Sequence, residues 1–298
     1  MPTKNAEAFI ADAIESYILN IPPNSVLVII EDHSEDNTYG VCRHYESQFP
    51  ERIILRKNPR AGKVSAINYG ESLVTYNFIK FVDSDDFINQ EFWHYLDKFS
   101  VSKKSFVHAF SLVDEESKLL GDMPIKYLNQ KEYKNYLKNL IVIPKVSWTF
   151  YHGDIEGMFP IPNDMPFEDI WFSYYYFANG KELQNIKQPL YFYRQHESQT
   201  FGNIDDYSEE RIIFRFTRLL KALEVIESQK LFKNLFDELQ VSKNICKFML
   251  KEISIIKFAK TTDFLTFCKH VLLRDFSIFY LILRKVLWLN RRIKGIFN

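Results

Sequence analysis

The first 110 residues alternate between short apolar runs and stretches with helical periodicity, and this alternation constrains the fold more than any other feature. Apolar residues recur at helical spacing over 9–18, whereas residues 26–30 form the unbroken apolar run VLVII. Such a run is typical of a parallel strand buried on both faces. The sequence therefore predicts βαβ units and an α/β fold. Further strands are expected over 53–55, 78–82, 106–110 and 190–193, and helices over 39–45, 64–74, 92–99 and 169–178.

The later part of the chain has a different pattern. Five prolines punctuate residues 118–166, which indicates loops over a binding surface. Residues 241–298 hold 12 Lys and Arg against 3 Asp and Glu. We expect an α/β domain over 1–204 and a helical, basic C-terminal region over 205–298. Helices in this region are expected over 212–226, 231–239, 245–258, 264–273 and 276–293.

Composition excludes several classes of protein. With 46% hydrophobic and 16% aromatic residues, the chain is not intrinsically disordered. Its 38 basic and 38 acidic residues cancel, which argues against a nucleic-acid partner. The three cysteines are widely spaced and form no zinc or disulfide pattern, so a reducing, cytoplasmic location is expected. The first residues do not resemble a signal peptide, and no run of 18 uncharged apolar residues suggests a membrane-spanning helix.

The sharpest local feature is the sequence Asp83-Ser84-Asp85-Asp86 at the end of the strand expected over 78–82. In open α/β sheets, ligands bind at the carboxyl ends of strands. Clustered carboxylates repel one another unless a cation lies between them, and oxygen ligands suit Mg²⁺ or Mn²⁺. Such a metal could bridge a substrate diphosphate. The alternative is a solvated acidic turn that caps the next helix.

Two further motifs lie at element boundaries in the first half. Glu31-Asp32 follows the strand expected over 26–30, where a carboxylate can accept hydrogen bonds from a nucleobase or a ribose. The alternative for this segment is a loop with a helix N-cap. Gly62-Lys63 opens a helix, which suits a phosphate, although the spacing is not that of a P-loop. An ordinary loop–helix junction would look the same.

Two more motifs lie in the second half. Glu168-Asp169 opens an aromatic helix, and a carboxylate in a pocket wall can act as a general base. Acidic residues are also favourable at a helix N-terminus without any catalytic role. Arg194 and His196 follow the strand expected over 190–193 and could reach a phosphate or a metal, although a lone His is more often structural.

Taken in order, these motifs resemble the inverting family 2 glycosyltransferases with the GT-A fold. The resemblance covers about residues 1–200 and rests on the ordered set rather than on one motif. It implies a Rossmann-like, mostly parallel central sheet flanked by helices, with a donor half over 1–115 and an acceptor half over 116–204. The matching segments are Pro2-Thr3-Lys4-Asn5, Glu31-Asp32-His33-Ser34 with Asp36, residues 62–68, Asp83-Ser84-Asp85-Asp86, Glu168-Asp169 and Tyr193-Arg194-Gln195-His196.

The resemblance also implies a nucleotide-sugar site. Thr3 and Asn5 would lie in the loop that flanks the nucleotide base. Asp32 would hydrogen-bond the uracil of a UDP-sugar, and Lys63 would lie near the donor's phosphates. The residues expected at the ribose and the sugar are Asp83 and Asp85.

A metal and a base complete the site that the resemblance implies. The divalent cation, Mn²⁺ or Mg²⁺, would be bound by residues drawn from Asp85, Asp86 and His196. Asp169 would take the proton from the acceptor hydroxyl. The residues expected to support these groups are Glu31, Glu168 and Arg194.

Three features depart from the family pattern. Glu31 stands where the family usually has Asp, which keeps the charge. Residues 145–165 lack the usual Gly-rich stretch before the Glu-Asp pair. In the family, the Pro-Thr pair follows a buried strand, whereas this sequence begins at Met1-Pro2. We therefore expect the first strand to be missing, through a truncated or misassigned start.

The sequence thus predicts a metal-assisted, inverting hexosyltransferase that moves a sugar from a UDP-sugar to a glycan or lipid-linked acceptor in bacterial surface polysaccharide synthesis. The alternatives are a nucleotidyltransferase-like enzyme and a non-catalytic nucleotide-sugar-binding protein. The basic, aromatic residues 241–298 suit an anionic membrane surface, which would place the protein at the inner face of the cell membrane. Packing of this region on the α/β domain or on a second subunit is the alternative.

Overall fold

The computed structural model describes residues 1–19, 22, 24–125, 134, 137–138, 142–180, 182–196 and 209–259, with the backbone alone for 209, 211–212, 249 and 251–259. Contacts divide the chain into two units, Met1–Cys246 and Lys247–Asn298. The described part of the second unit is the end of one helix. The helices expected over 264–273 and 276–293, and most of the basic region, lie outside the described residues.

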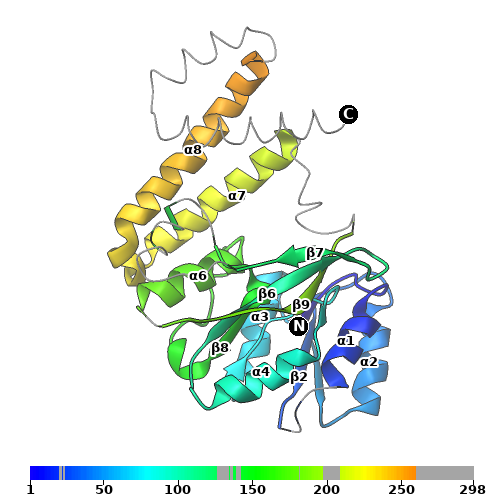
Figure 1. Ribbon diagram of the computed structural model, residues 1–298. Helices are drawn as coiled ribbons and strands as arrows, with labels where there is room; N and C mark the ends of the chain where they lie inside the picture. Colours follow the sequence, from blue (N-terminus) through cyan, green and yellow to red (C-terminus); the bar gives the residue numbers. More distant parts are fainter. Residues whose placement is uncertain are drawn as a thin grey trace. The chain divides into compact units, whose positions relative to one another are not determined.

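A parallel three-stranded sheet opens the first unit (Figure 1). Its strands, in spatial order, are β1 (Pro2–Thr3), β2 (Leu27–Glu31) and β3 (Ile53–Lys57). Thr3 lies opposite Glu31, and Glu31 opposite Lys57, so the carboxyl ends of the three strands meet at one edge. The helices between and after these strands are α1 (Ile10–Ile18), α2 (Thr38–Gln48) and α3 (Lys63–Ser72).

A mixed sheet follows, and its spatial order is β4-β8-β6-β9-β5, with β7 paired to β6. The long central strands β6 and β9 run parallel, whereas the other pairs are antiparallel. The predicted α/β class is therefore confirmed, with antiparallel strands added around a parallel pair. The strands are β4 (Phe78–Ile79), β5 (Phe87–Ile88), β6 (Phe106–Val113), β7 (Leu119–Met123), β8 (Trp148–Tyr151) and β9 (Gln184–Arg194).

The remaining helices pack an aromatic core. α6 buries Trp171, Phe172 and Tyr176, and Phe172 stacks on Phe81 with 5.1 Å between ring centroids. Trp148 stacks on Phe150 in β8 at 4.9 Å and belongs to the same cluster of buried residues. None of the described helices is long and apolar enough to cross a membrane. The helices are α4 (Glu91–Ser100), η1 (Lys145–Ser147), η2 (His152–Asp154), α6 (Glu168–Ala178), α7 (Glu209–Ser228), η3 (Lys230–Leu235) and α8 (Phe236–Ala259).

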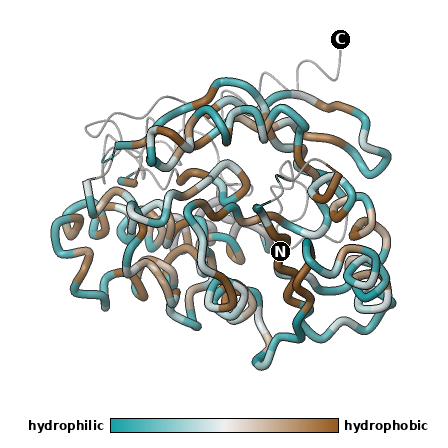
Figure 2. The backbone as a smooth tube through the Cα atoms, turned by 90° about the horizontal axis from the view of Figure 1, so that it is seen from below, coloured by the Kyte–Doolittle hydropathy of each residue, from teal (hydrophilic) through white to brown (hydrophobic). Residues whose placement is uncertain are grey.

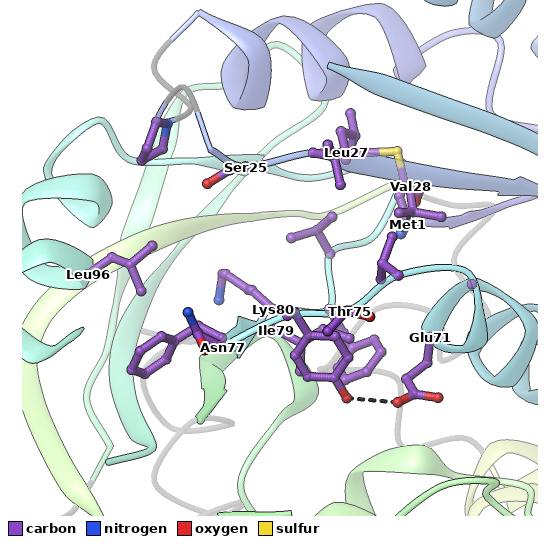
Figure 3. A pocket seen from close by; sticks show the side chains of 18 of the residues that line it. Met1, Ser25, Leu27, Val28, Glu71, Thr75, Asn77, Ile79, Lys80 and Leu96 are labelled. Atoms are coloured by element: carbon purple, nitrogen blue, oxygen red, sulfur yellow. Dashed lines mark hydrogen bonds between the residues drawn. The ribbon is translucent and has the colours of Figure 1, made fainter. Parts of the chain in front are cut away.

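A cavity of about 690 Å³ lies beside β1 (Figure 3). Figure 3 shows Met1 and Val28 on one side of this cavity, with Ile79 and Lys80 across from them. The ammonium group of Met1 donates a 2.8 Å hydrogen bond to the Val28 carbonyl. Because Pro2 pairs with Ile30, a backward extension of β1 would run beside Val28 and into this cavity. Figure 2 shows the chain starting among hydrophobic segments.

The cavity also explains why one predicted strand is short. The sequence predicts a strand over 78–82, but β4 ends at Ile79. Phe78 and Ile79 pair with β8 on one side, and the cavity lies on the other. Residues 80–82 therefore form no strand. The expected first strand before residue 2 stays a prediction, and the cavity lies where such a strand would pack.

Candidate active site

Asp32 is fixed at the end of β2 by two neighbouring segments. Its Oδ1 accepts a 2.7 Å hydrogen bond from the Asn58 side chain, and both of its oxygens lie 3.0 Å from the Gly62 backbone nitrogen. Gly62 has φ of 123°, a conformation that L side chains rarely adopt, so a glycine suits this junction with α3. Asp32 is buried but keeps carboxylate lone pairs for a further donor.

The loop after β1 is tied to the loop after β2. Asn5 accepts a 2.8 Å hydrogen bond from the Glu35 backbone at its Oδ1 and donates one from its own backbone to the Ser34 hydroxyl at 3.1 Å. Glu31 accepts a hydrogen bond from the backbone of Ser34, which closes the turn. The Thr3 hydroxyl is buried and has no hydrogen-bond partner among the described residues.

Asp83 lies in a cluster of four charged side chains, with Lys63, Lys145 and Glu168. The Lys63 ammonium lies 3.1 Å from Asp83 Oδ1 and 3.1 Å from Glu168 Oε1. Lys145, which is only 3% exposed, forms an ion pair with the same Asp83 oxygen and lies 3.5 Å from Glu168. Burial by itself would raise the pKa of Asp83, but the ammonium groups of Lys145 and Lys63 outweigh it and hold the pKa well below its usual range. Asp83 is therefore an anion in the folded protein.

The pKa of Asp169 shifts in the opposite direction to that of Asp83, although the same two lysines act on both carboxyl groups. Burial and the neighbouring Glu168 raise the pKa of Asp169 to about 7, against the opposing effect of Lys145 and Lys63. Its Oδ1 accepts a hydrogen bond from the Lys145 backbone nitrogen, which orients the carboxyl group at the start of α6. A carboxyl group with a pKa near neutrality can exchange a proton with a substrate, as a general base must.

The cavity around Asp169, here called the Asp169 cavity, has a volume of about 680 Å³. Its lining includes Lys63 at the start of α3, Lys145 in η1 and Arg218 in α7. Asp83 and Glu168 also line it, so four predicted site residues share one cavity. The first turn of α6 and the residues that follow β4 thus line the same cavity.

A second cavity, here called the Asp85 cavity, has a volume of about 690 Å³ and is lined by Asn5, Asp36, Asp85 and His196. His196 Nε2 lies 3.1 Å from Asp85 Oδ2, and the His196 ring packs against Phe9 with 4.8 Å between centroids. Carboxylate and imidazole groups are both ligands of divalent metals in proteins. Among the residues described, no group of three His, Cys, Asp or Glu side chains could hold a metal ion unaided.

Asp86 does not face either cavity. Its Oδ2 accepts a 2.9 Å hydrogen bond from the Tyr191 hydroxyl, and its Oδ1 accepts one of 2.9 Å from the Arg194 backbone. Asp86 is fully buried, and burial followed by repulsion from Asp85 raises its pKa well above the usual range. Both oxygens of Asp86 thus accept a hydrogen bond inside the protein, and a direct metal contact by this side chain stays a prediction. Asp86 anchors β9 to the segment Asp83-Ser84-Asp85-Asp86, here called the acidic segment.

Arg194 makes three contacts around the segment Asp83-Ser84-Asp85-Asp86. Its Nε donates to the Asp85 carbonyl at 3.0 Å, and its guanidinium also donates to the Glu115 carbonyl at 2.9 Å. A third contact joins it to the Asp12 carboxylate in α1 at 3.2 Å. Arg194 thus fixes the backbone of the acidic segment, and its role in supporting a ligand site stays a prediction.

Sequence reasoning missed Lys145 and Asn58. Lys145 lies in the proline-rich stretch, far in sequence from the carboxylates that it pairs with. Asn58 follows β3 and fixes Asp32. The one signal that could have found Asn58 is its place at the carboxyl end of a parallel strand. No sequence pattern singles out Lys145, since its role depends on contacts 62 residues apart.

Comparison with known proteins gives a consistent result. The family model described as glycosyl transferase family 2 matches residues 1–151. The minor teichoic acid biosynthesis protein GgaB of Bacillus subtilis is 33% identical over 92 residues, which are 30% of this chain and 10% of that protein. EpsH of the same organism is 26% identical over 208 residues, which are 65% of this chain and 59% of that protein. The chain thus spans only part of the length of these relatives.

Solved structures show the same fold. TarS 1–349 of S. aureus in complex with UDP-GlcNAc aligns with a TM-score of 0.57 at 15% identity, over 87% of this chain and 86% of that one. The mannosyltransferase PcManGT from Pyrobaculum calidifontis, in complex with GDP-Man and Mn²⁺, aligns with a TM-score of 0.56 at 16% identity, over 91% and 76% of the two chains. These likenesses confirm the predicted GT-A-type fold.

The order of motifs, the carboxylates at the strand ends and the family model all lead to one assignment. The model covers just over half of the chain, including β1 through β8. The chain belongs to glycosyl transferase family 2.

Proposed function

We propose that the protein transfers a sugar from a UDP-sugar to a hydroxyl group of a glycan or lipid-linked acceptor. The transfer would invert the configuration at the anomeric carbon. The observation that carries the proposal is Asp169, a partly buried carboxyl group with a pKa of about 7 that shares a cavity with the anionic Asp83. The match to a teichoic acid biosynthesis protein supports a setting in bacterial surface polysaccharide synthesis.

The donor would bind along the carboxyl ends of the strands. Asp32 and the loop with Thr3 and Asn5 would bind the uridine, and their fixed geometry supports this assignment. Asp83 would bind the ribose by exchanging its contacts with lysine for hydroxyl groups. Lys63 is half exposed and would move to the donor's phosphates. The neighbour crystallised with UDP-GlcNAc supports a nucleotide-sugar donor.

Asp85 and His196 would hold a divalent cation, Mn²⁺ or Mg²⁺. The donor set fits such an ion, because a carboxylate and an imidazole face one cavity and the substrate diphosphate would complete the ligands. When bound, the cation would supply positive charge next to the leaving diphosphate. A neighbour in complex with GDP-Man and Mn²⁺ supports a metal of this kind.

The chain's own residues would then direct the transfer. Asp169 in its ionised form would accept the proton of the acceptor hydroxyl, and that oxygen would form a bond to the anomeric carbon. The bond from this carbon to the phosphate oxygen would break on the opposite face, and its electron pair would leave with the nucleoside diphosphate. The Lys145 backbone would hold Asp169 in place during this step.

The test is a screen of UDP-, GDP- and dTDP-sugars with Mn²⁺, followed by Asp169→Asn. The asparagine should keep donor binding, measured by calorimetry, and lower transfer about 10²- to 10⁴-fold, the usual scale for a general base. The asparagine side chain is the matched control for shape, since only the proton acceptor is lost. Native transfer rates in Asp169→Asn would exclude Asp169 as the base. Donor binding without any transfer would favour a non-catalytic binding protein.

Residues 241–298 would hold the protein at an anionic membrane surface in the cytoplasm, and their charge supports this proposal. Liposome flotation at low salt, with and without anionic lipid, tests it. The full chain should float with anionic vesicles, and a chain ending near residue 270 should float less. A full chain that stays in solution in both cases would contradict membrane docking.

A further inference from the structure

Lys80 is a partly buried lysine that the proposed reaction does not use. It follows β4 directly, and Figure 3 shows Ile79 and Lys80 on the wall of the cavity beside β1. Burial of its amino group, followed by repulsion from Lys145, lowers the pKa of Lys80 well below the ordinary range. No carboxylate in the described part of the chain offsets this effect. A lysine in this position therefore depends on hydrogen-bond acceptors rather than on an ion pair.

The Lys80 amino group meets three acceptors from three elements. Its Nζ lies 2.9 Å from His108 Nε2 in β6, 2.8 Å from the Val146 carbonyl in η1 and 3.5 Å from the Trp148 carbonyl at the start of β8. The other nitrogen of the buried His108 ring, Nδ1, lies 2.8 Å from the Ala109 carbonyl, which makes Nδ1 the donor and leaves Nε2 as an acceptor. An ammonium group has three N–H donors, and these three acceptors match them.

These contacts begin where the pairing of β4 with β8 ends. The backbone pairing stops at Ile79, which lies opposite Phe150. Val146 is 4% exposed, and its carbonyl belongs to a helix of three residues, too short to supply partners for its last carbonyl groups. Lys80 supplies a donor to this carbonyl. Without that donor, the carbonyl would turn towards another partner and η1 would move with it.

Movement of η1 would displace the groups around the proposed base. The helix begins at Lys145, which donates its backbone N–H to Asp169 and pairs its ammonium group with Asp83. The carbonyl that Lys80 holds belongs to the next residue of the chain. Displacement of a catalytic group by about 1 Å can lower the rate of a reaction about 100-fold. The contacts of Lys80 are therefore close enough to the base to affect it.

We propose that Lys80, together with His108, is a positioning residue that fixes η1 and thereby the carboxyl group of Asp169. The inference rests on the proposed function and extends it to a pair of side chains behind the site. Lys80 and His108 line neither the Asp169 cavity nor the Asp85 cavity. They would act on the reaction through η1 and not by contact with a substrate.

The first experiment compares Lys80→Met with the unmodified full chain. Methionine keeps an unbranched side chain and removes the hydrogen bonds to η1 and β8. We expect kcat to fall about 10- to 100-fold, the scale for a misplaced catalytic group, and the Kd of the UDP-sugar, measured by calorimetry, to change much less. An unchanged kcat, or a loss of donor affinity as large as the loss of kcat, would overturn the proposal.

Ser105→Ala is the matched control for loss of stability. The buried Ser105 hydroxyl accepts a 3.0 Å hydrogen bond from the Tyr151 backbone at the other end of β8 and donates one of 2.9 Å to Asp154. Its removal should lower the melting temperature and leave kcat of the folded protein unchanged. The same fall in kcat in Ser105→Ala and Lys80→Met would contradict a specific role for Lys80.

The second experiment follows Asp169 itself and needs no substrate. The hydrogen bond from the Lys145 backbone lowers the pKa of Asp169, so loosening η1 should raise this pKa. Carbon-13 NMR of the aspartate carboxyl groups, assigned with Asp169→Asn, measures the titration in the unmodified protein and in Lys80→Met. An unchanged pKa would overturn the proposal. The charged residues that share the cavity with Asp169 are Arg60, Lys63, Asp83, Lys145, Glu168, Arg215 and Arg218.

Two variants of His108 test the same device with Lys80 in place. His108→Phe removes the acceptor at Nε2 and keeps a ring, whereas His108→Gln returns an acceptor. We expect His108→Phe to lower kcat and raise the pKa of Asp169, and His108→Gln to restore both towards the native values. If Lys80→Met does not fold, native values in His108→Phe would overturn the proposal. Absence of transfer from every nucleotide-sugar would contradict the proposed function, whereas the titration would still decide whether Lys80 and His108 position Asp169.

Discussion

The Asp85 cavity and the Asp169 cavity both take a side chain from the acidic segment after β4, yet they are built in different ways. The Asp85 cavity lies between loops that follow β1 and β2, joined by short hydrogen bonds such as that from the Glu35 backbone to Asn5. The Asp169 cavity is enclosed by α3, η1, α6 and α7, which the aromatic core holds together. Strand-end loops thus form one cavity, and helix packing forms the other.

This difference has a consequence for charge. In the Asp169 cavity, two lysines neutralise Asp83 and Glu168, while Asp169 keeps a pKa near neutrality. In the Asp85 cavity, Asp85 and His196 pair with each other and remain beside open space. We therefore propose that one cavity moves a proton and that the other holds a cation.

The largest expected effect separates Asp85 from its neighbour Asp86. Asp85→Ala should abolish Mn²⁺-dependent donor binding and leave the free energy of unfolding nearly unchanged. Asp86→Ala should lower the free energy of unfolding by about 2–5 kcal/mol, since the Tyr191 hydroxyl and the Arg194 backbone lose their buried acceptor. Calorimetry with Mn²⁺ and UDP, together with urea unfolding, measures both quantities. A stable Asp86→Ala protein without metal-dependent binding would return Asp86 to the metal site.

The next prediction concerns the pH dependence of the Asp169 cavity. Because the base must be ionised, kcat/KM should fall as the pH drops below about 7. Lys145 lowers the pKa of Asp169, so Lys145→Met should move this acidic limb to higher pH. Lys221→Met, which removes an exposed lysine outside the cavity, should leave the profile in place. If kcat/KM of Lys145→Met falls at the same pH as in the unmodified protein, a group other than Asp169 sets this pH dependence.

The cavity beside β1 predicts a gain in stability from a longer first strand. An apolar segment of about five residues added before Met1 should raise the free energy of unfolding by about 0.5–2 kcal/mol, because it fills the space beside Val28. The same segment with charged residues at every position is the control. An apolar extension that leaves stability and activity unchanged would contradict packing of a strand in this cavity.

The same extension has a predictable pH dependence. Burial, followed by repulsion from Lys145, lowers the pKa of the Met1 ammonium group from its ordinary value of 8.0 to about 5. The folded state therefore disfavours the charged form, and the loss of stability grows as the pH falls from 8 towards 5. Moving the amino terminus out of the cavity should help more at pH 6 than at pH 9.

The smallest expected effect is at Glu31. Glu31→Asp restores the residue that the family usually has, but the shorter side chain gives up the hydrogen bond to the Ser34 backbone. We expect a loss of about 1 kcal/mol in the free energy of unfolding and an unchanged rate of transfer. Glu35→Asp, at an exposed position in the same loop, is the control. A large fall in transfer would give Glu31 a direct role in donor binding.

Much of the donor half could be predicted from the sequence, because its signals are local. The apolar run over 26–30 and the helical spacing over 9–18 give the period and length of β2 and α1 directly. The carboxyl ends of parallel strands meet at one edge, so the sequence predicts a ligand site at Asp32. The same argument was applied to Asp83, although β4 pairs antiparallel with β8 in the second sheet. β7 and β8 were not predicted, since they are short, antiparallel and lie within the proline-rich stretch over 118–166.

The sequence by itself determined the α/β class and the order of motifs, because periodicity and strand-end position depend on neighbouring residues. Its candidate base, Asp169, came from the family resemblance and stays a prediction. Only the tertiary structure decided which carboxylates are available. Asp85 and Asp86 are adjacent, yet one lines a cavity and the other bonds to β9. The pairing of Lys145 with Asp83 and the place of Arg218 beside Phe167 also required the fold. Burial and ion pairing depend on residues far apart in the chain, and no local pattern records them.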